Sequence, residues 1–209
     1  MTAFIIANGE LNDPEFARTA LLNADHILAC DGGLKHCHTL GVTPNCIIGD
    51  LDSVDKNLLS NYPDVPIIKF PTDKDQTDLE LSLNHACSLG ASTVIVLAGL
   101  GGRIDHQLGN IHALVQAVKQ DIKAEIWDEH TKISIINNFC RLHKKDGEIV
   151  SLLPLSTTVC GITTSGLKYS LDDECLNVGY ARGVSNCIVG EYAEINLKSG
   201  FLVVVQTSD

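Results

Sequence analysis

Short apolar segments alternate with segments of helical periodicity through the first half of the chain, and this alternation constrains the fold more than any other feature. The apolar runs, several of them rich in β-branched residues, are typical of strands; they lie at residues 4–7, 27–30, 46–48, 67–70 and 94–98. Helices are predicted between and after them, at residues 14–23, 34–40, 54–61, 77–89 and 104–119. Because such alternation builds βαβ units, we predict an α/β domain with a mostly parallel, Rossmann-like sheet.

The second half of the chain contains strand-like segments without an amphipathic helix of ordinary length. These segments lie at residues 124–126, 132–136, 148–153, 158–162, 167–169, 193–197 and 201–206. Turn signals such as Asp146-Gly147 and Ser199-Gly200 separate them, a pattern typical of antiparallel sheets. We therefore predict an α/β domain over residues 1–138, followed by an all-β domain, a sandwich or a barrel, over residues 139–209.

The charge balance limits the partners of the chain. The sequence has 15 Lys and Arg against 26 Asp and Glu, a net charge of -11. Nucleic-acid binders need a basic surface, so this composition argues against a nucleic-acid partner and favours a small cationic substrate. The apolar run after Met1 is too short for a signal sequence or a membrane span, and we expect a cytoplasmic protein without a membrane partner.

The cysteines form no obvious framework. There are eight, none of them in a Cys-x-x-Cys pair, and most lie in apolar sequence. Disulfides are one alternative, but buried free thiols are the prediction that this pattern favours.

Acidic residues follow four of the predicted strands. Asp31-Gly32-Gly33 follows the second strand, Asp50 and Asp52 follow the third, residues 73–78 follow the fourth, and residues 99–105 follow the fifth. Ligands of open parallel sheets bind at the carboxyl ends of the strands. Aspartate and glycine are also ordinary turn and cap residues, which would explain any one motif alone. Four such motifs at one sheet edge favour a functional site.

Carboxylates crowded at one edge repel one another unless cations offset their charge. Mg²⁺ takes hard oxygen ligands and commonly bridges carboxylates to the phosphates of a nucleotide. Asp50 and Asp52 are two residues apart, so in an extended loop both would point toward one ion. Asp52 has a second interpretation, as the N-cap of a helix that begins near Ser53 or Val54.

The segment after the fifth strand is suited to phosphate. Gly101 and Gly102 allow close approach of the backbone, and Arg103 supplies a cation. The pattern is neither a Walker A loop nor a dinucleotide fingerprint. His106 has two interpretations, a general base or a structural histidine, and Asn110 follows it by one helical turn, so that both could face one cleft.

In this order and spacing, the motifs resemble those of the thiamin pyrophosphokinase (thiamin diphosphokinase) family, and the match is close to the bacterial type. The motifs are Asp31-Gly32-Gly33, Gly49-Asp50-Leu51-Asp52-Ser53, Lys74-Asp75-Gln76-Thr77-Asp78, Gly101-Gly102-Arg103-Ile104-Asp105-His106, Ser165-Gly166-Leu167-Lys168-Tyr169 and Gly183-Val184-Ser185-Asn186. The resemblance implies a catalytic α/β domain, a thiamin-binding β-sandwich, and a homodimer whose sites lie at the subunit interface. It also implies transfer of a diphosphoryl group from ATP to the hydroxyl of thiamin, which gives thiamin diphosphate and AMP.

The resemblance assigns roles by motif. Catalytic carboxylates would be Asp50, Asp52, Asp75, Asp78 and Asp105. Of these, Asp50, Asp52 and Asp78 would bind Mg²⁺ or its water, and Asp75 and Asp105 would be further ligands or the base for the thiamin hydroxyl. ATP and its phosphates would contact Asp31, Gly32, Gly33, Thr77, Gly101, Gly102, Arg103, His106 and Asn110. Thiamin would contact Ser185 and Asn186.

Two departures from the family pattern and two rival functions remain. Ser170 stands where the family has a proline, and the only tryptophan, Trp127, lies near the domain junction rather than near the C-terminus.

One rival function is a Mg²⁺-dependent phosphotransferase or phosphohydrolase with another nucleotide-derived substrate, although the Ser185-Asn186 loop and the β-rich half argue against it. The other is a non-catalytic ligand sensor, against which the presence of every motif acid argues.

Overall fold

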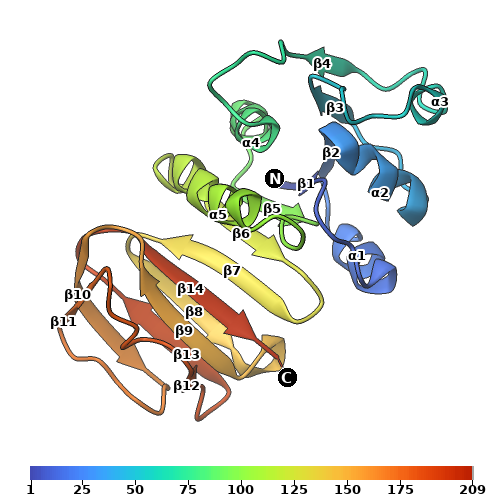
Figure 1. Cartoon of the computed structure of the whole chain (residues 1–209). Helices are drawn as coiled ribbons and strands as arrows, with labels where there is room; N and C mark the ends of the chain where they lie inside the picture. Colours follow the sequence, from blue (N-terminus) through green and yellow to red (C-terminus); the bar gives the residue numbers. More distant parts are fainter. Residues whose placement is uncertain (209) are drawn as a thin grey trace. The chain divides into compact units, whose positions relative to one another are not determined.

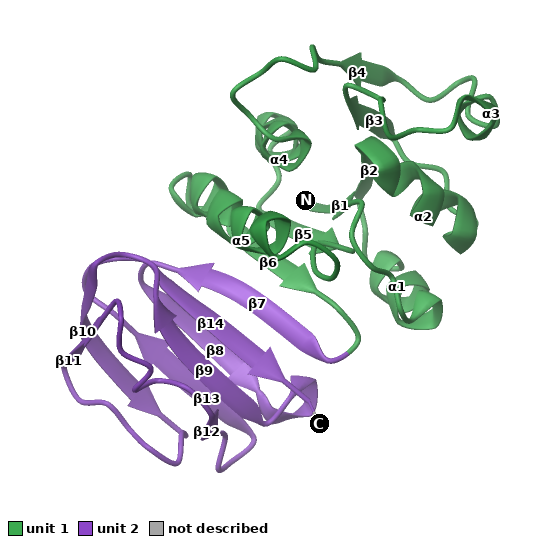
Figure 2. Cartoon of the chain, viewed as in Figure 1, with its two compact units in different colours: residues 1–129 green, residues 130–209 purple. Residues whose placement is uncertain are grey.

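The computed structural model describes residues 1–208 and consists of two compact units, Met1–Glu129 and His130–Asp209 (Figure 2). The division falls earlier than the predicted boundary at 138/139. The reason is that β7 (Thr131–Ile136) pairs antiparallel with β14 (Leu202–Thr207), which makes β7 a strand of the second unit.

The first unit is built on a parallel sheet, as predicted (Figure 1). Its strands are β1 (Thr2–Ile6), β2 (His26–Cys30), β3 (Cys46–Gly49), β4 (Ile67–Lys69), β5 (Thr93–Leu97) and β6 (Lys123–Trp127). They lie in the order β6-β5-β1-β2-β3-β4, and each neighbouring pair is parallel. The chain changes direction across the sheet beside β1, the kind of position where open α/β sheets bind ligands.

Three of the five helices of this unit begin after a residue whose side chain accepts from free N–H groups of the first turn. They are α1 (Pro14–Leu21), α2 (Leu34–Leu40), α3 (Lys56–Leu59), α4 (Asp78–Ser88) and α5 (Ile104–Val118). Asp13 caps α1, and Thr77 with Glu80 forms a capping box at α4. Asp55 caps α3, which is shorter than predicted, so capping does not explain Asp52. No helix within residues 1–208 is long and apolar enough to cross a membrane.

Side chains of β1 pack on both faces of the sheet. Phe4 and Ile6 lie in one apolar cluster with Ala17 of α1 and Leu34 of α2. Ile5, between them, points to the opposite face and is fully buried. On that side α4 packs against β1, β2 and β3, and it also packs against α5 (Figure 1). Because both faces are covered, the carboxyl ends of the strands are left for a site.

The second unit is a β-sandwich. Its other strands are β8 (Phe139–His143), β9 (Ile149–Pro154), β10 (Thr158–Ser165), β11 (Glu174–Asn177), β12 (Asn186–Cys187) and β13 (Tyr192–Asn196). One sheet has the order β12-β9-β14-β7 and the other β11-β10-β13-β8, with antiparallel pairing throughout. The fold class predicted from the sequence, an α/β domain followed by an all-β sandwich, is confirmed.

One apolar core lies between the two sheets of the sandwich. Leu152 and Val204 from the first sheet share this core with Val159 and Ile195 from the second. The predicted strand at residues 167–169 is wrong, since only an isolated bridge pairs Leu167 with Ile188. Strands β8, β11 and β12 were not predicted.

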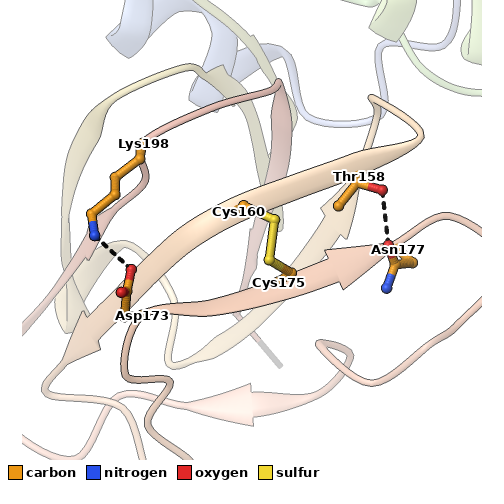
Figure 3. Close-up of a disulfide and its surroundings, with 6 residues drawn as sticks. All are labelled: Thr158, Cys160, Asp173, Cys175, Asn177 and Lys198. Atoms are coloured by element: carbon orange, nitrogen blue, oxygen red, sulfur yellow. Dashed lines mark hydrogen bonds and ion pairs between the residues drawn. A yellow bond between two sulfur atoms is a disulfide. The ribbon is translucent and has the colours of Figure 1, made fainter.

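Two cysteines correct the prediction of free thiols throughout. Cys160 and Cys175 form a disulfide between β10 and β11, with their Cα atoms 4.1 Å apart (Figure 3). Val159 pairs with Leu176, so antiparallel register sets the two cysteines opposite each other. A hydrogen bond between Thr158 and Asn177 lies on one side of this disulfide, and an ion pair between Lys198 and Asp173 lies on the other (Figure 3). By contrast, Cys30, Cys37 and Cys46 are buried free thiols, as predicted.

Candidate active site

A cavity of about 760 Å³ lies in the first unit, at the carboxyl ends of its strands. Most of the residues that were predicted to act in catalysis or ATP binding line this cavity. These are Asp31, Asp50, Asp52, Thr77, Asp78, Gly101, Gly102, Arg103, Asp105, His106 and Asn110. Residues from four separate loops therefore line one cavity, as expected from their positions at the ends of parallel strands.

Left-handed backbone marks three of these strand ends. Asp31 after β2, Leu51 after β3 and Ala98 after β5 have φ values of 47°, 67° and 52°. A non-glycine residue in this region costs about 1–3 kcal/mol, and such residues concentrate at functional sites. Left-handed backbone at three strand ends is therefore typical of turns that are kept for a functional site.

The turn at Leu51 corrects one step of the sequence argument. We expected an extended loop in which Asp50 and Asp52 point the same way. Instead Leu51 has a left-handed backbone with φ of 67°, and the Asp52 N–H donates to Asp50 Oδ1 at 3.1 Å. The Asp52 side chain is exposed and accepts a hydrogen bond from the Ser53 hydroxyl. Metal binding by Asp52 stays a prediction.

The turns bring three carboxylates together. One oxygen each from Asp31, Asp50 and Asp78 lies within 4.8 Å of the other two. Asp31 is only 8% exposed, and its Oδ1 has no hydrogen-bond partner within residues 1–208. A buried, unpartnered carboxylate oxygen is costly, so it points to a cation as the missing partner. We call Asp31, Asp50 and Asp78 the carboxylate cluster.

Lys74 lies beside this cluster and was not predicted as a site residue. Its Nζ donates a hydrogen bond to Asp50 Oδ2 at 3.3 Å, and lies 3.1 Å from Asp78 Oδ1, an ion-pair distance without good hydrogen-bond geometry. The side chain is 14% exposed. The available signal was a single cation within the acidic run of residues 73–78.

The surroundings shift the pKa values of two cluster members in opposite directions. Burial raises the pKa of Asp78, and the opposing contact with Lys74 does not cancel this effect. The backbone N–H of Asp52 lowers the pKa of Asp50, and Lys74 adds to that effect. The surroundings therefore stabilise the ionised form of Asp50 and destabilise the ionised form of Asp78.

A glycine loop over residues 99–102 borders the same cavity. Gly102 has φ of 67°, and an added Cβ there would meet nothing within 4 Å, so its backbone faces open space. The Gly102 N–H donates to Glu10 Oε1 at 3.1 Å, and Asn110 Nδ2 donates to the Gly99 carbonyl at 2.8 Å. Glu10 and Asn110 thus hold the loop in shape. Nothing in the sequence pattern indicated Glu10.

Arg103 and Asp105 form an exposed pair at the end of this loop. Arg103 Nε donates to Asp105 Oδ1 at 3.1 Å, and a second bond joins Nη2 to Oδ2. These bonds lower the pKa of Asp105 to about 2. A carboxyl with so low a pKa is a weak base near neutral pH. His106 is exposed, and its backbone N–H also donates to Asp105.

Three nominated residues lie away from the cavity lining. Asp75 is exposed and is not among the lining residues. Gly32 and Gly33 are buried in the turn at Asp31–Gly33, where an added Cβ at Gly33 would lie 2.0 Å from the Ile6 carbonyl oxygen. Gly33 therefore lets this turn pack against β1, and Gly32 lets it pack against the side chain of Asn8.

In the second unit, the side chain of Asn186 is engaged within the sandwich. Asn186 is 8% exposed, its Oδ1 accepts from the Tyr169 N–H at 3.0 Å, and its Nδ2 donates to the Tyr169 carbonyl at 2.7 Å. It therefore holds the loop that carries Lys168 and Tyr169. Ser185 is exposed, with φ of 58°, and its N–H donates to Ser151 Oγ. Their contact with thiamin stays a prediction.

The parallel sheet, the strand-end carboxylates and the open glycine loop together define a nucleotide-dependent phosphotransferase class. Comparison with known families makes this specific. Residues 17–126 match the family described as "Thiamin pyrophosphokinase, catalytic domain". Residues 139–202 match "Thiamin pyrophosphokinase, vitamin B1 binding domain".

Individual relatives agree. Thiamine pyrophosphokinase of Bacillus subtilis is 26% identical over 188 residues, which cover 87% of each chain. Thiamine pyrophosphokinase 1 of rice, Oryza sativa, is 26% identical over 172 residues, which cover 76% of this chain and 64% of the rice protein. The crystal structure of the Bacillus subtilis protein matches with a TM-score of 0.89 and 25% identity, over 100% of both chains.

This chain belongs to the thiamin pyrophosphokinase family. It is a diphosphotransferase, and its reaction is the transfer of a diphosphoryl group from ATP to thiamin.

Proposed function

We propose that the cavity of the first unit binds ATP with Mg²⁺, that the β-sandwich supplies contacts to thiamin, and that the reaction yields thiamin diphosphate and AMP. The observation that carries this assignment is the carboxylate cluster with its unpartnered Asp31 oxygen, lying on the same cavity as an open glycine loop.

The cluster suits a hard divalent cation. Its donors are carboxylate oxygens, which Mg²⁺ prefers, and Asp31 Oδ1 has no hydrogen-bond partner among residues 1–208. We propose Asp31, Asp50 and Asp78 as the residues that hold it, with Asp52 acting on a metal-bound water. When bound, Mg²⁺ would neutralise phosphate charge and help to align the phosphates for in-line transfer.

The chain's own groups then position the substrates. The thiamin hydroxyl attacks the β-phosphorus of ATP, a bond to that phosphorus forms, and AMP leaves with the electrons of the broken bond. We propose that the backbone of Gly101 and Gly102 and the Arg103 guanidinium hold the phosphates. His106 and Thr77 border the same space.

Base catalysis has a small part in this proposal. Of the two predicted proton acceptors, Asp105 has a pKa of about 2 because it is paired with Arg103, and Asp75 lies outside the cavity lining. A loose phosphoryl-transfer transition state demands little of a base, because charge neutralisation and alignment contribute most of the rate.

Further elements of the proposal concern thiamin and the assembly. The thiazolium ring is cationic, which suits a chain of net charge -11. We propose that Ser185 contacts thiamin directly and that Asn186 acts by holding the Tyr169 loop. A homodimer with sites at the subunit interface and a cytoplasmic location complete the proposal.

The test is release of AMP from ATP with Mg²⁺, measured with and without thiamin. We expect one AMP for each thiamin diphosphate formed, and none when thiamin or Mg²⁺ is omitted. Thiamin monophosphate is the matched control, because its hydroxyl oxygen is already esterified. ADP as the product, or AMP release that does not depend on thiamin, would support the rival phosphotransferase or phosphohydrolase.

A further inference from the structure

The ammonium of Lys74 lies among the carboxylates that we assign to the metal. Its Nζ is 3.3 Å from Asp50 Oδ2 and 3.1 Å from Asp78 Oδ1, so it contacts two of the three cluster members. The side chain is 14% exposed, whereas those of Asp50 and Asp78 are 10% and 23% exposed. The ion pair is therefore partly buried, and solvent screens it less than it would screen a fully exposed pair.

An ammonium and a divalent cation cannot share this cluster cheaply. Three carboxylates whose oxygens lie within 4.8 Å of one another are partly neutralised by Lys74. A second cation a few ångströms from the ammonium would be repelled, and the repulsion is strong where water is scarce. Because the ammonium lies against Asp50 Oδ2 and Asp78 Oδ1, Lys74 and the metal would compete for these two carboxylate oxygens.

A second anionic partner would be available to Lys74 in the same cavity. Lys74 lines the same cavity as Gly102 and Arg103, the residues that we assign to the phosphates. A lysine carries its charge on a flexible four-carbon stem, so it can move without moving the backbone. A phosphate oxygen of the nucleotide offers a new anionic partner for the ammonium.

We propose that Lys74 and the divalent cation occupy the carboxylate cluster alternately. Lys74 occupies it in the metal-free protein, and it moves to a substrate phosphate when the metal enters. This inference rests on the proposed function, because it takes the cluster as the metal site. Its consequence is that Lys74 lowers the affinity of the nucleotide-free protein for the metal, since metal binding has to displace it.

The test measures binding of Mn²⁺ alone, by the electron paramagnetic resonance signal of free Mn²⁺, in the full chain without nucleotide. We expect Lys74→Met to bind Mn²⁺ more tightly than wild type by about tenfold or more, because the competing charge is gone. Lys74→Arg, which keeps the charge, should remain close to wild type. Lys74→Gln is a second neutral variant, and metal-free thermal unfolding verifies that each variant is folded.

Lys35→Met is the matched control. Lys35 lines the same cavity but makes no ion pair with the cluster within residues 1–208, so this variant changes the net charge equally without affecting the exchange. The inference is overturned if Lys74→Met and Lys74→Gln bind Mn²⁺ no more tightly than wild type, or if Lys35→Met tightens binding as much. Thiamin-dependent AMP release by the wild type tests the proposed function separately, so the two can fail independently.

Discussion

The Asp78→Asn variant is expected to lose turnover by about three orders of magnitude or more while remaining folded. Asp78 is one of the three carboxylates of the cluster and begins α4 at the edge of the cavity. Asparagine keeps the size of the side chain but removes the charge that would attract Mg²⁺. The loss should therefore appear in the chemical step rather than in the fold.

The direction of the pKa shift explains why the fold survives this change. Burial raises the pKa of Asp78, so its ionised form costs folding free energy at neutral pH, and the cost diminishes as pH falls through the raised pKa. Asparagine removes that cost, although Lys74 loses one partner. We expect the free energy of unfolding at pH 7 to stay within about 1 kcal/mol of wild type.

Steady-state AMP release and urea unfolding measure the two halves of this prediction. Asp73→Asn is the matched control, because Asp73 is an exposed carboxylate of the same segment that does not line the cavity. It should keep near-normal turnover. An active Asp78→Asn variant that still responds to Mg²⁺ would contradict the metal assignment.

The Gly33→Ala variant is expected to lose about 3 kcal/mol or more of folding free energy, or to fail to accumulate as folded protein. Gly33 has an ordinary helical φ of -59°, so backbone strain is not the reason. The reason is space, since an added Cβ would lie 2.0 Å from the Ile6 carbonyl oxygen of β1. Backbone of a central strand cannot yield without disturbing its pairing with β2 and β5.

Gly41→Ala is the matched control, because it tests the requirement for left-handed backbone without a packing clash. Gly41 ends α2 with φ of 69°, and an added Cβ there would meet nothing within 4 Å. Its cost should be about 1 kcal/mol, which comes from the left-handed backbone alone. Chemical unfolding of both variants is the measurement, and equal stability losses would show that packing at Gly33 does not matter.

Much of the first unit could be predicted from local sequence signals for strands, helices and helix caps. The run from Ile27 to Cys30 and the helix at Leu34–Leu40 have clear strand and helix signals, and Thr77 with Glu80 marks the start of α4. Since consecutive strands are parallel, residues that follow them meet at one edge. That geometry placed Asp31, Asp50 and Asp78 at one site before any side-chain position was known.

The features that escaped prediction depend on contacts between distant residues. Lys74 meets Asp50 across 24 positions of sequence, and the left-handed backbone of Leu51 beside Asp50 leaves no sequence signal. Cys160 and Cys175 pair because of the register between β10 and β11, and β11 is short, with only Leu176 of its four residues buried. Glu10 reaches Gly102 across 92 positions of sequence.

We propose that Asp31, Asp50 and Asp78 hold the divalent cation of this thiamin diphosphotransferase. The most direct measurement is anomalous diffraction from crystals of the full chain grown with Mn²⁺ and α,β-methylene ATP, in which the bond that breaks in the reaction is blocked. We expect a Mn²⁺ peak about 2.0–2.3 Å from carboxylate oxygens of at least two of these residues and in contact with the nucleotide's phosphates. A nucleotide-bound Mn²⁺ peak away from all three carboxylates would contradict it.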